Sequence, residues 1–72
     1  MIVFKLISKK GNTLNFEVQD DFELFDISVD YETGEITMKD NISQKTKKWI
    51  YKVFGDIKPE SKYPDRFVIG WN

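Results

Sequence analysis

The chain contains no cysteine and no histidine. Disulfides, thiol nucleophiles, imidazole bases and the commonest zinc ligands are therefore excluded. Acid–base chemistry would fall to carboxylates, and a pair such as Asp26 and Asp30, four residues apart on a strand, is separated by about 13 Å. That separation is too long for a glycosidase pair. The sequence predicts a protein that is not an enzyme, with no catalytic residues, no cofactor and no metal site.

Long apolar runs are also missing, and none approaches the ~20 residues that span a bilayer. With no signal peptide either, we expect a cytoplasmic protein that makes no membrane contact. Of the 72 residues, 40% are apolar and 15% aromatic, which is enough for one core and predicts a single domain, 1–72. Alanine is absent and lysine makes up ten of the eleven basic residues, a composition typical of a low-GC bacterium or a phage.

Alternating apolar residues predict five strands, at 1–8, 13–19, 22–31, 35–39 and 66–71. The turn at Gly11-Asn12 makes the first two strands a hairpin, for which the sequence allows two registers. A two-residue loop sets Ile7 opposite Phe16, whereas a three-residue loop sets Leu6 there. In the third strand, Leu24 falls out of phase, and a bulge near Leu24-Phe25 would restore the phase.

A single helix is expected over 42–54. Asn41 and Gln44 form an Asn-x-x-Gln capping box, and Gly55 stands where a helix C-terminal glycine is expected. Trp49 is expected to be the largest anchor between helix and sheet. Phase places further aromatic residues in the core, namely Phe16, Phe25, Phe67 and Trp71. The phase leaves other aromatic residues less firmly placed, among them Phe22, Tyr51, Phe54 and Tyr63.

The element order ββββαβ defines the topology. Three tight connections give an antiparallel meander, and the right-handed crossover rule makes the fifth strand parallel to the fourth. Only the edge beside the first strand then allows antiparallel pairing. The fold class is therefore α+β, a five-stranded mostly antiparallel sheet of order 4-3-2-1-5 with one helix on one face. The other face is expected to be polar and mostly acidic, with Glu17, Asp26, Asp30, Thr37 and Lys39 on it. Part of a set of apolar residues is expected there too, namely Val3, Ile7, Phe22, Leu24 and Val68.

Charge is segregated along the chain. Residues 11–38 hold eight acids and no base, whereas residues 39–62 hold seven lysines against three acids. An acidic field can steer a basic partner toward a surface. The candidate partner-binding residues are Glu17, Asp20, Asp21, Glu23, Asp26, Asp30 and Glu32. This pattern favours a small protein-binding module that occupies a basic surface on another protein, as a phage- or mobile-element-type inhibitor or a toxin-neutralising partner does.

Two alternatives stay open. The helix lysines could contact phosphates and make the chain a nucleic-acid-binding accessory protein. Its candidate residues are Lys45, Lys47, Lys48 and Lys52. A sequence pI near 5.3 and a single arginine weigh against a long polyanion as the ligand. The second alternative is a domain that forms a homodimer through its open sheet face.

Overall fold

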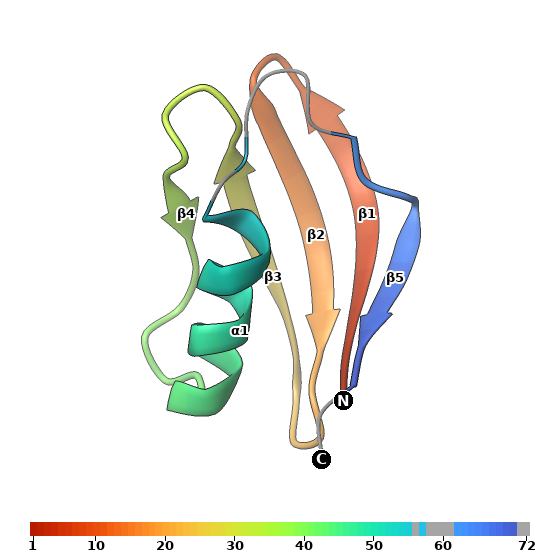
Figure 1. The fold of residues 1–72 in the computed structure, drawn as a ribbon, viewed down its shortest axis with the longest axis vertical. Helices are drawn as coiled ribbons and strands as arrows, with labels where there is room; N and C mark the ends of the chain where they lie inside the picture. The colour runs from red at the N-terminus through yellow and green to blue at the C-terminus, as the bar shows by residue number, and fades with distance from the viewer. Residues whose placement is uncertain (56, 58–61, 71–72) are drawn as a thin grey trace.

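A computed structural model describes residues 1–55, 57 and 62–70. The strands are β1 (Ile2–Lys10), β2 (Thr13–Gln19), β3 (Leu24–Asp30), β4 (Ile36–Thr37) and β5 (Arg66–Ile69), and the helix is α1 (Gln44–Phe54). The strands form one sheet of order β4-β3-β2-β1-β5 in which all neighbours are antiparallel (Figure 1). The predicted fold class and strand order are confirmed. The predicted core position Trp71 lies outside the described residues.

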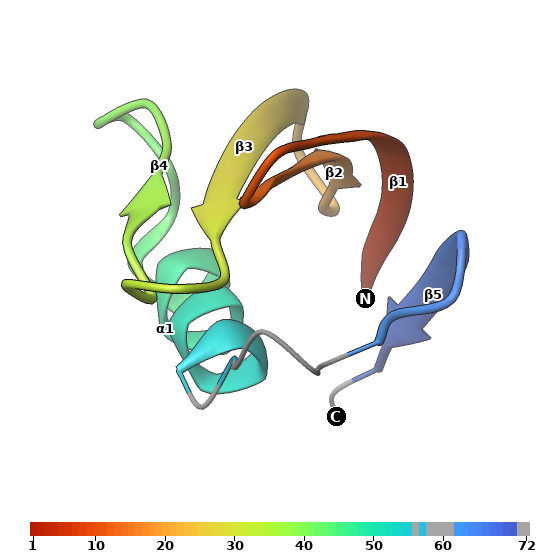
Figure 2. The ribbon, with the colours of Figure 1, turned by 90° about the horizontal axis from the view of Figure 1, so that it is seen from above.

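The sheet curves around its core. Figure 2 shows it as an arch, with α1 inside the arch near β3 and β4 and with β5 at the opposite rim. The helix-side face holds the buried apolar residues of β1, β2 and β3, because side chains alternate between the two faces. The buried apolar side chains are Ile2, Phe4, Leu14, Phe16, Val18, Phe25, Ile27, Val29, Ile42, Ile50 and Phe54.

The centre of this core is a cluster of aromatic rings. Phe4 stacks on Phe67 with 4.7 Å between ring centroids, and this contact joins β1 to β5. Phe54 reaches from the end of α1 to within 5.1 Å of Phe16 and 5.3 Å of Tyr63. The expectation for Trp49 is therefore corrected: it is only half-buried, while Ile50 and Phe54 are fully buried and anchor the helix. The helical phase placed Trp49 in the core and left Phe54 at the border of the lysine-bearing side of the helix, so it did not rank these positions correctly.

The first hairpin combines features of both registers that the sequence left open. Its loop has two residues, Gly11-Asn12, with Gly11 at φ 57° and Lys10 opposite Thr13. Yet Leu6 rather than Ile7 lies opposite Phe16. A β-bulge at Ile7 takes up the extra residue, so that Ile7 is exposed and Ser8 faces the same side as Lys5.

The bulge predicted in the third strand is wrong. Leu24 pairs with Gln19 and Phe25 with Val18, with no slip between them. Leu24 simply points to the face away from the helix, where it is 57% exposed. The strand begins at Leu24 rather than at residue 22, because the segment 20–23 forms the turn from β2. The fourth strand is also shorter than predicted, with two residues in place of 35–39.

The helix begins two residues later than predicted. Its N-cap is Ser43, which makes no side-chain capping bond, so the capping box of Asn41 is wrong. Ile42 is instead buried at 5% exposure in the chain segment that enters the helix. At the other end, Gly55 has φ −63° and ψ −29°, a right-handed conformation, so it does not form the left-handed C-terminal cap that its position predicts.

Candidate protein-docking face

The sheet face away from α1 is called the open face here. Because the core residues of each strand point to the helix, the intervening residues point outward in four cross-strand rows. The rows run Val68–Val3–Gln19–Leu24, Arg66–Lys5–Glu17–Asp26, Ser8–Asn15–Ser28–Thr37 and Lys10–Thr13–Asp30. The first row is apolar at its two ends, the second is charged, the third is polar and neutral, and the fourth mixes charged and neutral side chains.

The neutral row is held together by hydrogen bonds. Asn15 donates from Nδ2 to Ser8 Oγ at 3.1 Å and accepts at Oδ1 from Ser28 Oγ at 2.7 Å. The half-buried amide thereby links β1, β2 and β3 across the middle of the open face. Such a ladder fixes side-chain positions in that part of the surface, which reduces the conformational entropy that a docking partner must remove.

Asp20, one of the predicted partner-binding residues, is a buried side chain of the β2–β3 turn. It is 8% exposed and lies between the β2–β3 turn and the helix. Its Oδ1 accepts from the N–H groups of Phe22 and Glu23, both at 2.8 Å, and its Oδ2 accepts from the Thr46 hydroxyl at 2.9 Å. The carboxylate therefore fastens the turn to the first turn of α1, which has no acidic residue of its own.

The pKa of Asp20 reflects this position. Desolvation by burial alone would raise it, but the two backbone N–H groups, the Thr46 hydroxyl and the charge of Lys39 together outweigh that effect. The pKa of the carboxyl is thereby lowered from its ordinary value. Asp20 consequently stays ionised at neutral pH and holds the turn against the helix.

Glu23, another predicted partner-binding residue, lies in the β2–β3 turn and pairs with a lysine of the chain. Its carboxylate forms an ion pair with Lys39, and the Lys39 ammonium lies 5.6 Å from the Phe25 ring centroid. Lys39 was expected on the open face and instead reaches toward the core side of β3. β4 ends at Thr37, so the strand alternation that predicted its direction no longer applies. This pair neutralises part of the acidity that the sequence assigned to the docking surface.

The other candidate acids divide between the face and its two ends. Glu17 and Asp26 lie on the open face, directly opposite one another on β2 and β3. Asp30 ends that face, and its Oδ1 accepts from the N–H groups of Glu32 and Thr33 at 2.8 and 3.1 Å. Glu32 is exposed in this turn, while Asp21 is exposed in the β2–β3 turn, 3.5 Å from the α-amino nitrogen of Met1.

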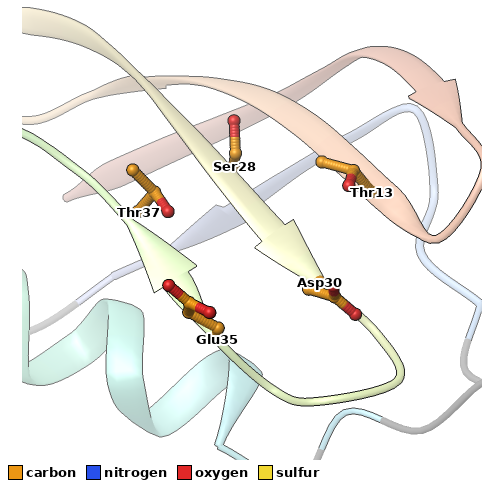
Figure 3. Close-up of a pocket in the computed structure, with 5 residues that line it drawn as sticks. All are labelled: Thr13, Ser28, Asp30, Glu35 and Thr37. Atoms are coloured by element: carbon orange, nitrogen blue, oxygen red, sulfur yellow. The ribbon is translucent and has the colours of Figure 1, made fainter.

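A polar pocket of about 260 Å³ opens beside Asp30. Figure 3 shows its lining side chains, which come from the ends of β2 and β3 and from the segment around β4. They are Thr13, Ser28, Asp30, Glu35 and Thr37. Two carboxylates, three hydroxyls and no basic group suit a cationic side chain. The sequence-based list omitted Glu35, although its place after the Gly34 turn puts it beside Asp30.

An apolar surface occupies the opposite end of the molecule, around the β2–β3 turn. Phe22 is 86% exposed, and its backbone is held by the bond to Asp20. Leu24 and Val68, which end the first row, are 57% and 45% exposed. Exposed aromatic and aliphatic side chains beside charged groups are typical of interface anchors. The expected apolar part of this face is thus present, with Val3 in the same row.

The open face also carries a basic half that the sequence reasoning missed. Lys5 and Arg66 pair across β1 and β5, next to the acids of β2 and β3 in the same row. These bases lie 61 residues apart in the sequence and were counted in different segments. The predicted strand order places the first and fifth strands side by side, and the alternation of side chains puts Lys5 and Arg66 on the same face. Together these two features could have revealed the basic half. The face is therefore acidic on one side and basic on the other.

Lysines of α1 make local contacts within the chain. Lys47 donates to the Asp40 carbonyl at 2.9 Å, and the Lys52 ammonium lies 4.8 Å from the Trp49 ring centroid. Lys45 and Lys48 are exposed. Within the described part of the chain, α1 is too short and too polar to cross a membrane, and no other helix is present.

Comparison of the chain with protein-family models, with curated proteins and with solved structures gives no match.

Proposed function

We propose that this chain is a non-enzymatic module that binds a protein through its open face. The observation that carries the proposal is the composition of that face. One unpartnered side of the sheet combines an exposed apolar end, a fixed polar ladder and segregated charges. Interfaces are built in this way, from apolar anchors surrounded by polar contacts.

The chemistry of the partner follows from the two ends of the face. The apolar end, at Phe22, Leu24 and Val68, requires apolar side chains on the partner. The acidic half, at Glu17, Asp26 and the pocket beside Asp30, requires cationic groups. Binding of this kind would cover a basic surface on the partner. The chain would then act as an inhibitor, because the partner could no longer bind its own ligand through that surface.

The nucleic-acid alternative has less support. Helix lysines, among them Lys47 and Lys52, already contact groups of the chain, and the acids on the neighbouring turns would repel phosphates. A titration of labelled DNA and RNA at about 50 mM and about 200 mM salt distinguishes the two functions. We expect no binding at either salt concentration. Binding that weakens steeply with salt would favour the lysines instead.

The open face is tested by comparing three baits in extracts of the source cell. These are the wild type, an open-face variant (E17Q, L24S and D26N) and a helix variant (K45Q, K48Q and K52Q), each checked for folding by circular dichroism. Quantitative mass spectrometry then measures the captured proteins other than the bait. We expect the wild type and the helix variant to capture the same protein and the open-face variant to lose it. Loss with the helix variant only would contradict the proposal.

A further inference from the structure

The charged row of the open face is antisymmetric. From β5 to β3 it reads Arg66, Lys5, Glu17 and Asp26, two bases followed by two acids. All four side chains lie on the same face, because Phe67, Phe4, Val18 and Phe25 beside them point into the core. The centre of the antisymmetry lies between β1 and β2, the two longest neighbouring strands of the sheet.

Within one chain this arrangement is unfavourable at both ends of the row. Glu17 faces Asp26 directly, and Lys5 faces Arg66 directly, so that like charges lie opposite one another. Only Lys5 and Glu17, at the centre, are opposite charges in adjacent positions. In the described part of the chain neither Asp26 nor Arg66 makes an ion pair. The fold itself gives no reason for this order of charges.

A two-fold rotation provides the missing partners. An axis parallel to the strands, between β1 and β2 and between two facing sheets, places β1 of one copy over β2 of the other and β5 over β3. Lys5 then meets Glu17 of the second copy, and Arg66 lies on the same side as Asp26 of the second copy, so that opposite charges attract across the gap toward the edge. Each like-charged pair thereby lies against a pair of the opposite sign, which is the self-complementarity that an isologous interface requires.

The same rotation matches the rows on either side. In the first row, Val68 lies on the same side as Leu24 of the second copy, and Val3 at the centre of the row meets Gln19. In the third row, Ser8 meets Asn15 of the second copy, and polar groups meet polar groups. One operation therefore matches the three rows, with direct contact at β1 and β2. A rotation centred on any single strand would place that strand's own charge against itself.

We propose that the open face binds a second copy of this chain in this face-to-face arrangement. The inference rests on the proposed docking function and adds a second copy of the chain as a further partner of the same face. The open face is the outer side of the arch (Figure 2), so contact is centred on β1 and β2 and falls away toward the edges. A narrow contact with ion pairs at its centre gives a weak dimer whose dissociation constant rises with salt.

Analytical ultracentrifugation of complementary charge variants tests this arrangement. One variant, K5E with R66E, makes the row wholly acidic, and another, E17K with D26K, makes it wholly basic. We expect the wild type to dimerise at concentrations up to about 1 mM and each variant alone to dissociate at least about tenfold more readily. An equimolar mixture of the two variants should form a heterodimer, because acidic and basic rows then face each other.

Controls keep the result interpretable. K48E changes a helix lysine on the other side of the molecule and should leave dimerisation unchanged. If a charge-reversal variant does not fold, the neutral variant E17Q with D26N is measured in its place. This variant should weaken the dimer and reduce the dependence of its dissociation constant on salt. A wild type that stays monomeric at about 1 mM, or a variant mixture that stays monomeric, overturns the inference.

The outcome separates this inference from the proposed function. If the wild type is monomeric but the open-face bait loses a captured protein that the helix bait keeps, docking stands and the second copy is not the partner. A second outcome is that the wild type dimerises, that K48E abolishes the dimer, and that the two charge-reversal variants still dimerise. In that case the face-to-face arrangement is wrong, and so is the open face as the site of dimerisation.

Discussion

The two faces of this sheet are built from the same strands, yet the sequence constrains them differently. On the helix side, alternate residues of β1, β2 and β3 are apolar and nearly inaccessible, and Phe4, Phe16 and Val18 are fully buried. On the open face, the intervening residues include like charges placed opposite one another, such as Glu17 and Asp26. The first pattern is what stability requires, whereas the second costs stability. The difference indicates that the open face is shaped by a requirement other than folding.

Breaking the helix-side face should produce the largest effect. Phe54→Ala removes a fully buried ring that contacts Phe4, Phe16 and Tyr63, and we expect a loss of about 3–5 kcal/mol in the free energy of unfolding. In a domain this small, that approaches the whole stability. Urea denaturation followed by circular dichroism measures it.

The matched control is Tyr51→Ala, one helical turn earlier and 53% exposed. This change should cost about 0.5 kcal/mol or less, as surface substitutions do. Equal losses for the two variants would mean that the helix does not pack on the sheet through Phe54.

A smaller effect is expected where the two faces meet at the β2–β3 turn. Asp20→Asn keeps an acceptor for the Phe22 and Glu23 N–H groups but removes the charge and the oxygen that accepts from Thr46. Hydrogen bonds to a charged group contribute about 1.5–3 kcal/mol, so we expect a loss within that range or just below it at pH 7. Thermal unfolding of this variant beside Asp21→Asn, the exposed neighbour, measures the difference.

The same variant carries a pH signature. Because the pKa of Asp20 is lower in the folded protein than its ordinary value, its stabilisation is present above about pH 4. That stabilisation is lost as the pH falls through the folded pKa. The difference in free energy of unfolding between wild type and Asp20→Asn should therefore shrink as the pH is lowered from 7 to about 2. A difference that stays constant over this range would show that the carboxylate charge plays no part.

The smallest effect on stability is expected on the open face. Glu17→Gln with Asp26→Asn removes two facing carboxylates, so the melting temperature of the monomer should stay unchanged or rise slightly. The measurement is made at about 5 µM protein, well below the concentrations at which weak dimers form. Lys48→Gln is the control for a charge change elsewhere. A loss above about 1 kcal/mol would reveal intrachain partners for these acids and remove the contrast between the faces.

The strand order could be predicted because it depends on features that a sequence carries locally. Alternation assigned each strand residue to a face, tight turns fixed the meander, and the handedness of the crossover placed β5 beside β1. This also placed Glu17, Asp26 and Asp30 on the open face correctly. Position within a strand is a sufficient predictor of direction wherever the strand is regular.

The remaining errors occur where strands stop or slip. Asp20 and Asp21 look alike in the sequence, but only Asp20 meets Thr46, which lies 26 residues further along the chain. Lys39 follows the end of β4, so alternation no longer determines its direction. The bulge lies at Ile7 instead of at Leu24, because the two-residue turn and the packing of Leu6 against the core must both be satisfied.

The central claim is that the open face of this sheet is a binding surface for a second copy of the chain. It is tested most directly by recording amide and methyl NMR spectra of the wild type as the protein is concentrated from about 20 µM to about 1 mM, a range that spans a weak self-association. The account predicts shifts that grow with concentration at open-face residues, among them Val3, Lys5, Glu17 and Leu24, while Ile50 and Phe54 stay constant. Spectra that do not change, or changes confined to the helix lysines, would contradict it.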